Sequence, residues 1–177
     1  MKCYKKYFYR NISTDIYEYL DHNNLIYNNE IFYNDIDHIK FLKQFPEIQT
    51  FIESHKTYCI GIGLIKIFYN KVAIHQDNSA SNGGTIRLNW PVLNCEYSDT
   101  IFYDNFNGVK QKKLLDNGII FHEYRDEDCK EIDRVCLDSP TALNVSVPHR
   151  VRCEKFPRVS LSFHLKPSPN WLLTKID

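Results

Sequence analysis

The chain has 177 residues, and its 22 basic side chains balance 22 acidic ones, which gives a formal net charge of zero. This balance argues against a nucleic-acid-binding surface and against a polybasic membrane anchor. A chain of this length can bury a core of its own, so the sequence predicts a single domain over residues 1–177.

No stretch of the chain approaches the roughly 20 apolar residues that a membrane span requires, and the N-terminus lacks the apolar core of a signal peptide. The six cysteines form no Cys-x-x-Cys pair. These features predict an intracellular, cytoplasmic protein with reduced thiols and without a membrane or nucleic-acid partner.

Residues 1–56 are predicted to form a helical layer. Ser13 or Thr14 is suited to cap a short helix that continues through Leu20, and the Asn-rich stretch at 21–35 predicts mostly loop. Apolar residues then recur at roughly helical spacing between 36 and 54. Pro46 is expected to divide this run into two helices and to lie in the first turn of the second.

From Tyr58 onward the apolar period changes to two, which is typical of strands. Turn-rich segments separate these runs, and the acidic residues 126–128 are interpreted as a solvated loop. The predicted strands are residues 58–68, 72–75, 85–92, 99–104, 118–124, 134–138, 141–147 and 158–165. A mainly β chain with this many short strands favours a double-stranded β-helix (a cupin-like jelly roll) or a related barrel over 57–166, followed by a C-terminal tail at 167–177.

Two predicted strands carry polar side chains on one face and apolar side chains on the other. The polar residues are Arg158, Ser160, Ser162 and His164 in one strand, and Thr85, Arg87 and Asn89 in the other. Such faces either point to water or line a ligand cavity. A serine-rich face with one arginine suits a carboxylate pocket better than a solvent face, which usually carries lysine and glutamate.

A metal site is predicted from three residues. His75 and Asp77 are two apart at a strand end, so their side chains can point the same way, and His149 is the best candidate for a third ligand. Two imidazoles and one carboxylate can cap one face of an Fe(II) ion and leave the other positions open. Arg158 adds a planar, permanently charged fork that suits a carboxylate.

The segments that carry these residues resemble the core of the Fe(II)/2-oxoglutarate-dependent oxygenases, and in particular small members of that superfamily. The resemblance spans about residues 57–165 and is strongest at 73–77, 86–94, 98–103, 147–151 and 157–163. It implies that His75, Asp77 and His149 hold Fe(II) and carry the chemistry. Because Asp77 is present where the related halogenases have a small residue, hydroxylation is favoured over halogenation.

The same resemblance implies that 2-oxoglutarate is a co-substrate whose distal carboxylate binds Arg158, with help from Ser160. Asn89 is expected to contact the co-substrate or its surroundings. The implied reaction hydroxylates an unidentified small-molecule or peptide substrate and releases succinate and CO2.

Two alternatives use the same residues differently. The chain is then either a cupin-like metalloenzyme that does not use 2-oxoglutarate, or a non-catalytic jelly-roll binding module. Arg87 is interpreted equally as a substrate anchor or an ion-pair partner, and a structural role is placed first for His164. The absence of a Gly-x-Ser-x-Gly motif argues against a hydrolase, and Gly61-Ile62-Gly63 lacks the third glycine of a dinucleotide-binding fingerprint.

Overall fold

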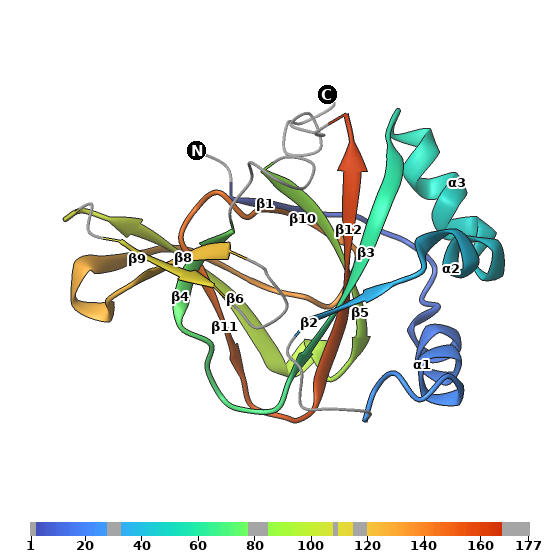
Figure 1. Ribbon diagram of the computed structural model, residues 1–177, viewed down its shortest axis with the longest axis horizontal. Coiled ribbons are helices and arrows are strands. Elements are labelled where there is room, and N and C mark those ends of the chain that lie inside the picture. Colours follow the sequence, from blue (N-terminus) through green and yellow to red (C-terminus); the bar gives the residue numbers. More distant parts are fainter. Residues whose placement is uncertain (1–2, 28–32, 78–84, 108–109, 115–119, 168–177) are drawn as a thin grey trace.

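The computed structural model of the chain describes residues 3–27, 33–77, 85–107, 110–114 and 120–167 (Figure 1). These residues form two antiparallel six-stranded sheets with three α-helices outside them. The mainly β class and the N-terminal helices are therefore as predicted. The predicted tail beyond residue 167 lies outside the described residues.

We call the two sheets sheet I and sheet II. Sheet I has the order β1 (Tyr4–Lys6), β10 (Thr141–Asn144), β5 (Ile86–Leu93), β12 (Arg158–Lys166), β3 (Tyr58–Ile67) and β2 (Tyr33–Ile36). Sheet II has the order β7 (Gln111–Leu114), β8 (Ile120–Tyr124), β4 (Ile74–Asp77), β11 (His149–Cys153), β6 (Ser98–Asn105) and β9 (Cys129–Cys136). Short 3-10 helices span Cys95–Tyr97 and Asp126–Asp128.

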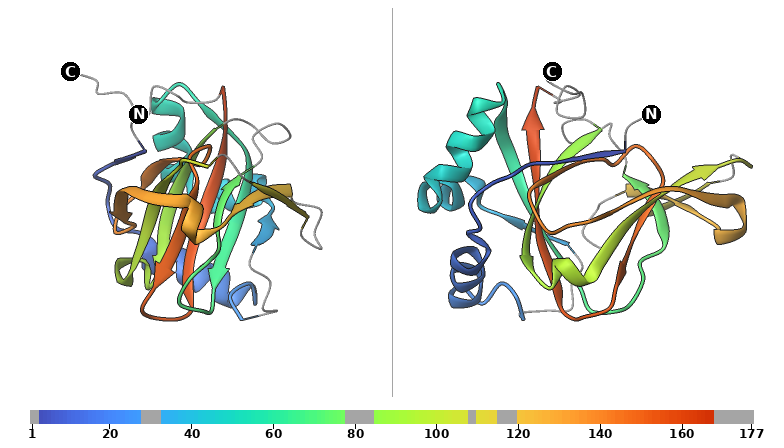
Figure 2. Two further views of the ribbon diagram at one scale, coloured as in Figure 1. Left: turned by 90° about the vertical axis from the view of Figure 1, so that its left-hand side faces the viewer. Right: turned by 180° about the vertical axis from the view of Figure 1, so that it is seen from behind.

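The helices α1 (Ser13–His22), α2 (His38–Gln44) and α3 (Pro46–Ser54) all lie on the side of sheet I that faces away from sheet II (Figure 2). Pro46 begins α3 as predicted, because its ring is compatible with the first helical turn and its missing N–H has no partner there. Asp37 caps α2 by accepting hydrogen bonds from the backbone N–H groups of Ile39 and Lys40.

The expected cap of α1 is wrong. Neither Ser13 nor Thr14 caps the helix, because it begins at Ser13 after Ile12, and the Asn11 side chain instead accepts a hydrogen bond from the Ser13 backbone N–H at 3.0 Å. The hydroxyl of Ser13 instead donates to the backbone carbonyl of Pro91, 2.8 Å away, and so ties α1 to β5. The Ser13 hydroxyl thus bonds to a distant strand and not to the backbone of its own helix.

The main hydrophobic core lies between sheet I and the helices. Apolar side chains that alternate along β5 and β12 meet apolar faces of the three helices, and each such large side chain contributes about 1.5–3 kcal/mol when it is fully buried. The strand residues in this core include Ile86, Leu88, Trp90 and Val92 from β5 and Val159, Leu161, Phe163 and Leu165 from β12. A smaller apolar cluster comprises Cys3, Phe102, Val135, Leu143, Val145 and Val147.

The strand predictions need several corrections. Four strands were missed, namely β1, β2, β7 and β11, and β2 falls within the stretch at 21–35 that was predicted to be mostly loop. The predicted strand at 141–147 ends at Asn144, and a turn separates it from β11. β4 begins at Ile74 and β9 at Cys129, two residues later and five residues earlier than predicted. Short and highly polar strands give little alternation to detect, which explains these errors.

No helix among the described residues is long and apolar enough to cross a membrane. The six cysteines are free thiols, which agrees with the expectation of reduced cysteines.

Candidate metal centre and the polar inner face

On β5 and β12, the face of sheet I that looks towards sheet II is polar, although it is buried. On β5 and β12 the residues between the apolar ones point away from the helices, and the Arg158 guanidinium reaches Ser98 in sheet II. The buried polar residues of these two strands are Arg87, Asn89, Arg158, Ser160 and Ser162. A β-sandwich normally packs apolar side chains between its sheets, so this inner face is an unusual place to bury charge.

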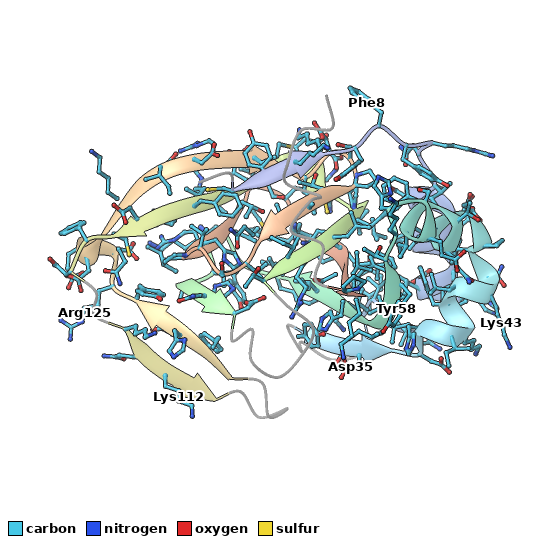
Figure 3. The ribbon with its side chains drawn as sticks, turned by 90° about the horizontal axis from the view of Figure 1, so that it is seen from above. Phe8, Asp35, Lys43, Tyr58, Lys112 and Arg125 are labelled. Carbon is cyan, nitrogen blue, oxygen red and sulfur yellow. The ribbon has the colours of Figure 1, made fainter. Side chains whose placement is uncertain are left out.

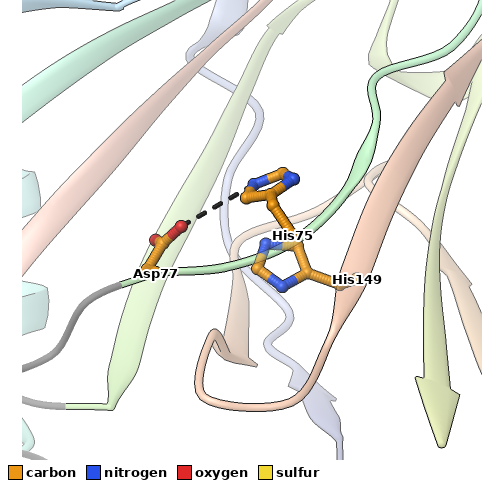
Figure 4. A group of neighbouring side chains, drawn as sticks. All are labelled: His75, Asp77 and His149. Carbon is orange, nitrogen blue, oxygen red and sulfur yellow. Dashed lines mark ion pairs between the residues drawn. The ribbon is translucent and has the colours of Figure 1, made fainter. Parts of the chain in front are cut away.

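Opposite this face, sheet II brings His75, Asp77 and His149 together (Figure 4). His75 and His149 are register partners in the antiparallel pair of β4 and β11, so their side chains leave the same face of the sheet. Asp77 lies two residues after His75 and shares this face. One ligand atom from each residue lies within 4.8 Å of the other two, and the His75 Nε2 atom is 3.7 Å from a carboxylate oxygen of Asp77.

The hydrogen bonds of the two imidazoles determine which nitrogen is available to a metal. The Nδ1 atom of His75 lies 2.9 Å from the Ala73 carbonyl, and that of His149 lies 2.9 Å from the Val147 carbonyl. A carbonyl oxygen can only accept, so both Nδ1 atoms carry the proton and donate it. Each neutral ring therefore keeps its lone pair on Nε2, as a metal ligand requires.

Burial keeps His149 neutral. Its side chain is 6 % exposed, and this desolvation, together with the nearby His75, lowers the pKa of His149 to about 4, against a smaller opposing effect of Asp77. The ring of Phe102 flanks His149 at 6.1 Å, and that of Phe121 flanks His75 at 5.8 Å, between ring centroids. The two imidazoles are thus held in one orientation by hydrogen bonds and by packing.

The three donors fit a divalent transition metal. Two imidazole nitrogens and one carboxylate oxygen on one side of a site make up the donor set of the non-haem Fe(II) facial triad. Sheet II carries a further histidine, His122, on β8. It is the register partner of Gln76 and therefore lies on the opposite face of the sheet from His75 and Asp77, so it cannot join the cluster.

Arg158 is the first residue of β12 and is 2 % exposed. Its NH1 group donates to the Ser160 hydroxyl at 2.8 Å, and its Nε lies 3.4 Å from the Ser98 hydroxyl. Among the described residues no carboxylate forms an ion pair with Arg158. A buried guanidinium held by two neutral hydroxyls retains its capacity to bind an anion.

Other polar groups of the inner face also lack protein partners. The Thr100 hydroxyl is buried without a hydrogen bond. Thr100 lies between Ser98 and Phe102 on the inner face of β6, because these residues are spaced two apart along the strand. Asn89 is 4 % exposed and is the register partner of Ser162. No hydrogen bond to another described residue engages the side chain of Asn89 or of Ser162. Buried polar groups of this kind normally have partners, so a ligand or water is expected between the sheets.

The candidate co-substrate residues Arg158, Ser160 and Asn89 therefore share the inner face of sheet I, and the candidate metal ligands share the inner face of sheet II. Sequence reasoning missed Ser98 and Thr100, which lie on the metal-bearing sheet. The available signal was their spacing, because Ser98, Thr100 and Phe102 are two residues apart along β6 and therefore share one face of the strand.

Sequence reasoning also missed an ion pair on the opposite face of sheet II. Arg150, next to His149, is buried and pairs with Asp126, which also pairs with Lys71 at 3.1 Å. The Arg150 guanidinium packs over the Tyr103 ring, 5.4 Å from its centroid. The acidic run at 126–128 is therefore not simply a solvated loop, because Asp126 anchors the strand that carries His149 and Asp128 is buried.

Models of protein families, curated proteins and solved structures were each compared with the chain, and none of them matches it.

Proposed function

We propose that the chain is an Fe(II)- and 2-oxoglutarate-dependent dioxygenase that hydroxylates a small-molecule or peptide substrate and releases succinate and CO2. One observation carries this proposal: a cluster of two histidines and one aspartate faces a sheet that holds a buried arginine, and no described carboxylate pairs with that arginine. The first feature suits the metal, and the second suits the carboxylate of a keto acid.

The strand pairing supports a jelly roll for this chain. Among β3, β4, β5, β6, β9, β10, β11 and β12, the first strand pairs with the last, β4 pairs with β11, β5 with β10, and β6 with β9. This nested antiparallel pairing is what results when one long hairpin is rolled into two sheets, which is the double-sheet jelly-roll arrangement. β7 and β8 are then an insertion between β6 and β9.

His75, Asp77 and His149 are the residues that would hold the iron through two Nε2 atoms and one carboxylate oxygen. Bound iron supplies the capacity to activate dioxygen and to couple the oxidation of 2-oxoglutarate to that of the substrate. The carbonyls of Ala73 and Val147 keep the imidazoles in the required tautomer, and the Phe102 and Phe121 rings limit their rotation.

Arg158 would bind the distal carboxylate of 2-oxoglutarate, and Ser160 and Ser98 orient its guanidinium. Ser98 and Phe102 lie on the same face of β6, and Phe102 is the register partner of His149. The arginine and the metal cluster thus lie at two levels between the sheets, and the dicarboxylate would bind between them. The Thr100 hydroxyl lies between these levels without a hydrogen-bond partner, and it would donate to the keto acid.

The proposal is tested by anaerobic titration of the protein with Fe(II) and then with 2-oxoglutarate. We expect the weak visible charge-transfer band of a chelated keto acid, and succinate once air is admitted. His75→Ala should abolish the band, and His122→Ala should preserve it, because His122 is on the other face of the sheet.

The outcomes also separate the alternatives. Fe(II) binding with neither a band nor succinate would overturn the 2-oxoglutarate proposal in favour of a cupin-like metalloenzyme. Wild-type protein that retains no divalent ion when purified without chelator, and does not differ from His75→Ala, would favour a non-catalytic binding module.

A further inference from the structure

A second basic group lies on the inner face of sheet I, at the end away from Arg158. Arg87 on β5 is 4 % exposed and is the register partner of His164 on β12. His164 lies six residues after Arg158 on the same face of β12, which separates the two positions by about 20 Å of extended strand. The polar inner face therefore carries one guanidinium towards each end.

His164 is held by a tyrosine from the sheet edge. The hydroxyl of Tyr33 in β2 lies 3.1 Å from the His164 Nε2 atom, although β3 runs between β2 and β12. Gly63 of β3 makes this reach possible, because a Cβ there would lie 2.2 Å from the Tyr33 ring. The segment Gly61-Ile62-Gly63, which lacks the third glycine of a dinucleotide-binding fingerprint, thus leaves room for a Tyr33–His164 contact across the strand.

The backbone brings this group of residues close to the metal cluster. The Asp77 N–H donates to the Val145 carbonyl at 3.1 Å, and the Val145 N–H donates at 2.9 Å to the carbonyl of Thr85, two residues before Arg87. Burial lowers the pKa of Arg87, whereas the Asp77 carboxylate and Tyr33 raise it. Asp77 acts on His164 in the same direction, although burial and Arg87 lower the pKa of that residue to about 4. Asp77 is therefore close enough to act on both residues, and His164 is a neutral hydrogen-bonding group next to a cationic one.

Metal binding changes the charge that Arg87 experiences. Asp77 supplies negative charge on this side of the cluster, and the exposed Asp35 adds some from the sheet edge. A divalent cation on Asp77 outweighs its single negative charge, because bound cations are often the largest local charges in a site. The surroundings of Arg87 then become cationic, which favours an anionic ligand beside the metal.

We propose that Arg87, with Tyr33 and His164, forms a substrate subsite that binds the carboxylate of a small organic acid on the Asp77 side of the metal cluster. The inference rests on the proposed function and gives that function a substrate class. A guanidinium fork matches a carboxylate in shape and charge. The neutral His164 imidazole lies beside it and is held by the Tyr33 hydroxyl, which also hydrogen-bonds the Asp35 side chain. The burial of Arg87 between two sheets favours a small acid over a side chain of a folded protein.

The test uses two probes of nearly equal size that differ in charge, hexanoate and hexanamide. Each is titrated into the anaerobic complex of full-length protein, Fe(II) and saturating 2-oxoglutarate, and the charge-transfer band reports binding. We expect hexanoate to perturb the band of the wild type saturably and hexanamide to have no effect. Arg87→Gln should weaken hexanoate binding about tenfold or more, in line with the loss of a charged hydrogen bond. The matched control is Arg125→Gln, which changes an exposed arginine on the sheet II side of the molecule and should behave as the wild type.

The readouts keep the two proposals apart. Failure of the wild type to give the band at all overturns the dioxygenase proposal, and the subsite proposal with it. An intact band that hexanoate does not perturb, or perturbs equally in wild type and Arg87→Gln, overturns the subsite alone. An Arg87→Gln protein that is folded by circular dichroism but has lost the band identifies Arg87 as a residue that positions Asp77, and this also overturns the subsite.

If Arg87→Gln does not fold, Tyr33→Phe takes its place, because it keeps the ring against Gly63 and removes only the hydroxyl. Weaker hexanoate binding with an unchanged band then supports the subsite, and unchanged hexanoate binding counts against it.

Discussion

The two faces of strands β5 and β12 have opposite roles. One face buries Leu88, Trp90 and Phe163 against the helices, and the other presents Arg87, Asn89 and further polar residues to sheet II. Strand alternation alone produces this division, since neighbouring residues point to opposite sides. Figure 3 shows the helices gathered at one end of this view and the strands of sheet II towards the other. The larger apolar core lies between sheet I and the helices, and a smaller apolar cluster that includes Phe102 and Leu143 shares the space between the sheets with the polar residues. Stability and the proposed chemistry are thereby assigned to different faces of the same strands.

The largest expected effect compares two neighbours on β12. Phe163→Ala should lower the free energy of unfolding by about 3–5 kcal/mol, because it removes a fully buried ring from the core beside the helices. Ser162→Ala should change it by less than about 1 kcal/mol, because this hydroxyl has no hydrogen bond to break among the described residues. Urea unfolding measures both, and similar losses would contradict the division between the two faces.

The next effect concerns the metal cluster. His149→Ala should lower Fe(II) affinity by more than about 100-fold, because loss of a ligand exceeds the 10–100-fold cost of losing an outer hydrogen-bond partner. Equilibrium titration measures this loss, with His122→Ala as the control. Unchanged Fe(II) affinity in His149→Ala would show that the inner face of β11 does not hold the metal.

Arg158 provides a test on the facing sheet. Arg158→Ala should weaken 2-oxoglutarate binding about 10–100-fold and leave Fe(II) affinity unchanged, because under the proposal this arginine binds the keto acid and is not a metal ligand. Arg158→Lys should be intermediate, since an ammonium lacks the planar fork. Titration of the charge-transfer band provides the readout, and Arg134→Ala, an exposed arginine paired with Glu131, is the control. An Arg158→Ala enzyme that remains fully active would favour a metalloenzyme that does not use 2-oxoglutarate.

The smallest effect concerns the ion pair behind His149. The hydrogen bond from Arg150 is the main cause that lowers the pKa of Asp126, with a further contribution from Lys71. A folded-state pKa below the unfolded value means that this stabilisation is present at neutral pH and is lost as pH falls through the folded pKa. Because 58 % of the Asp126 side chain is exposed, Asp126→Asn should cost at most about 1 kcal/mol at pH 7. Urea unfolding over a pH series should show the wild type and the variant converging in acid, and a difference that grows in acid would be inconsistent with the pair.

The parts of the site that follow local periodicity could be predicted from the sequence. His75 and Asp77 share a face because they are two residues apart on one strand, and Arg158 and Ser160 share a face for the same reason. The split of the helical segment at Pro46 follows from the stereochemistry of proline. Each of these results depends on covalent neighbours alone.

The remainder depended on contacts between distant residues. β11 alternates charged and apolar residues too briefly to be recognised, and only its pairing with β4 places His149 opposite His75. The Arg150–Asp126 pair and the Tyr33–His164 contact likewise join segments far apart in the chain. No local pattern indicates which partner a buried side chain will meet.

The sequence by itself determined which residues share a face, because alternation along a strand is a property of the extended backbone. It also identified the residue types that suit a metal and a carboxylate. Only the tertiary structure decided which face became the apolar core and which became the polar interior, because that choice depends on where the helices pack. Strand register, set by the pairing of whole sheets, then brought the two histidines and the aspartate within reach of one another and placed the arginines on the facing sheet.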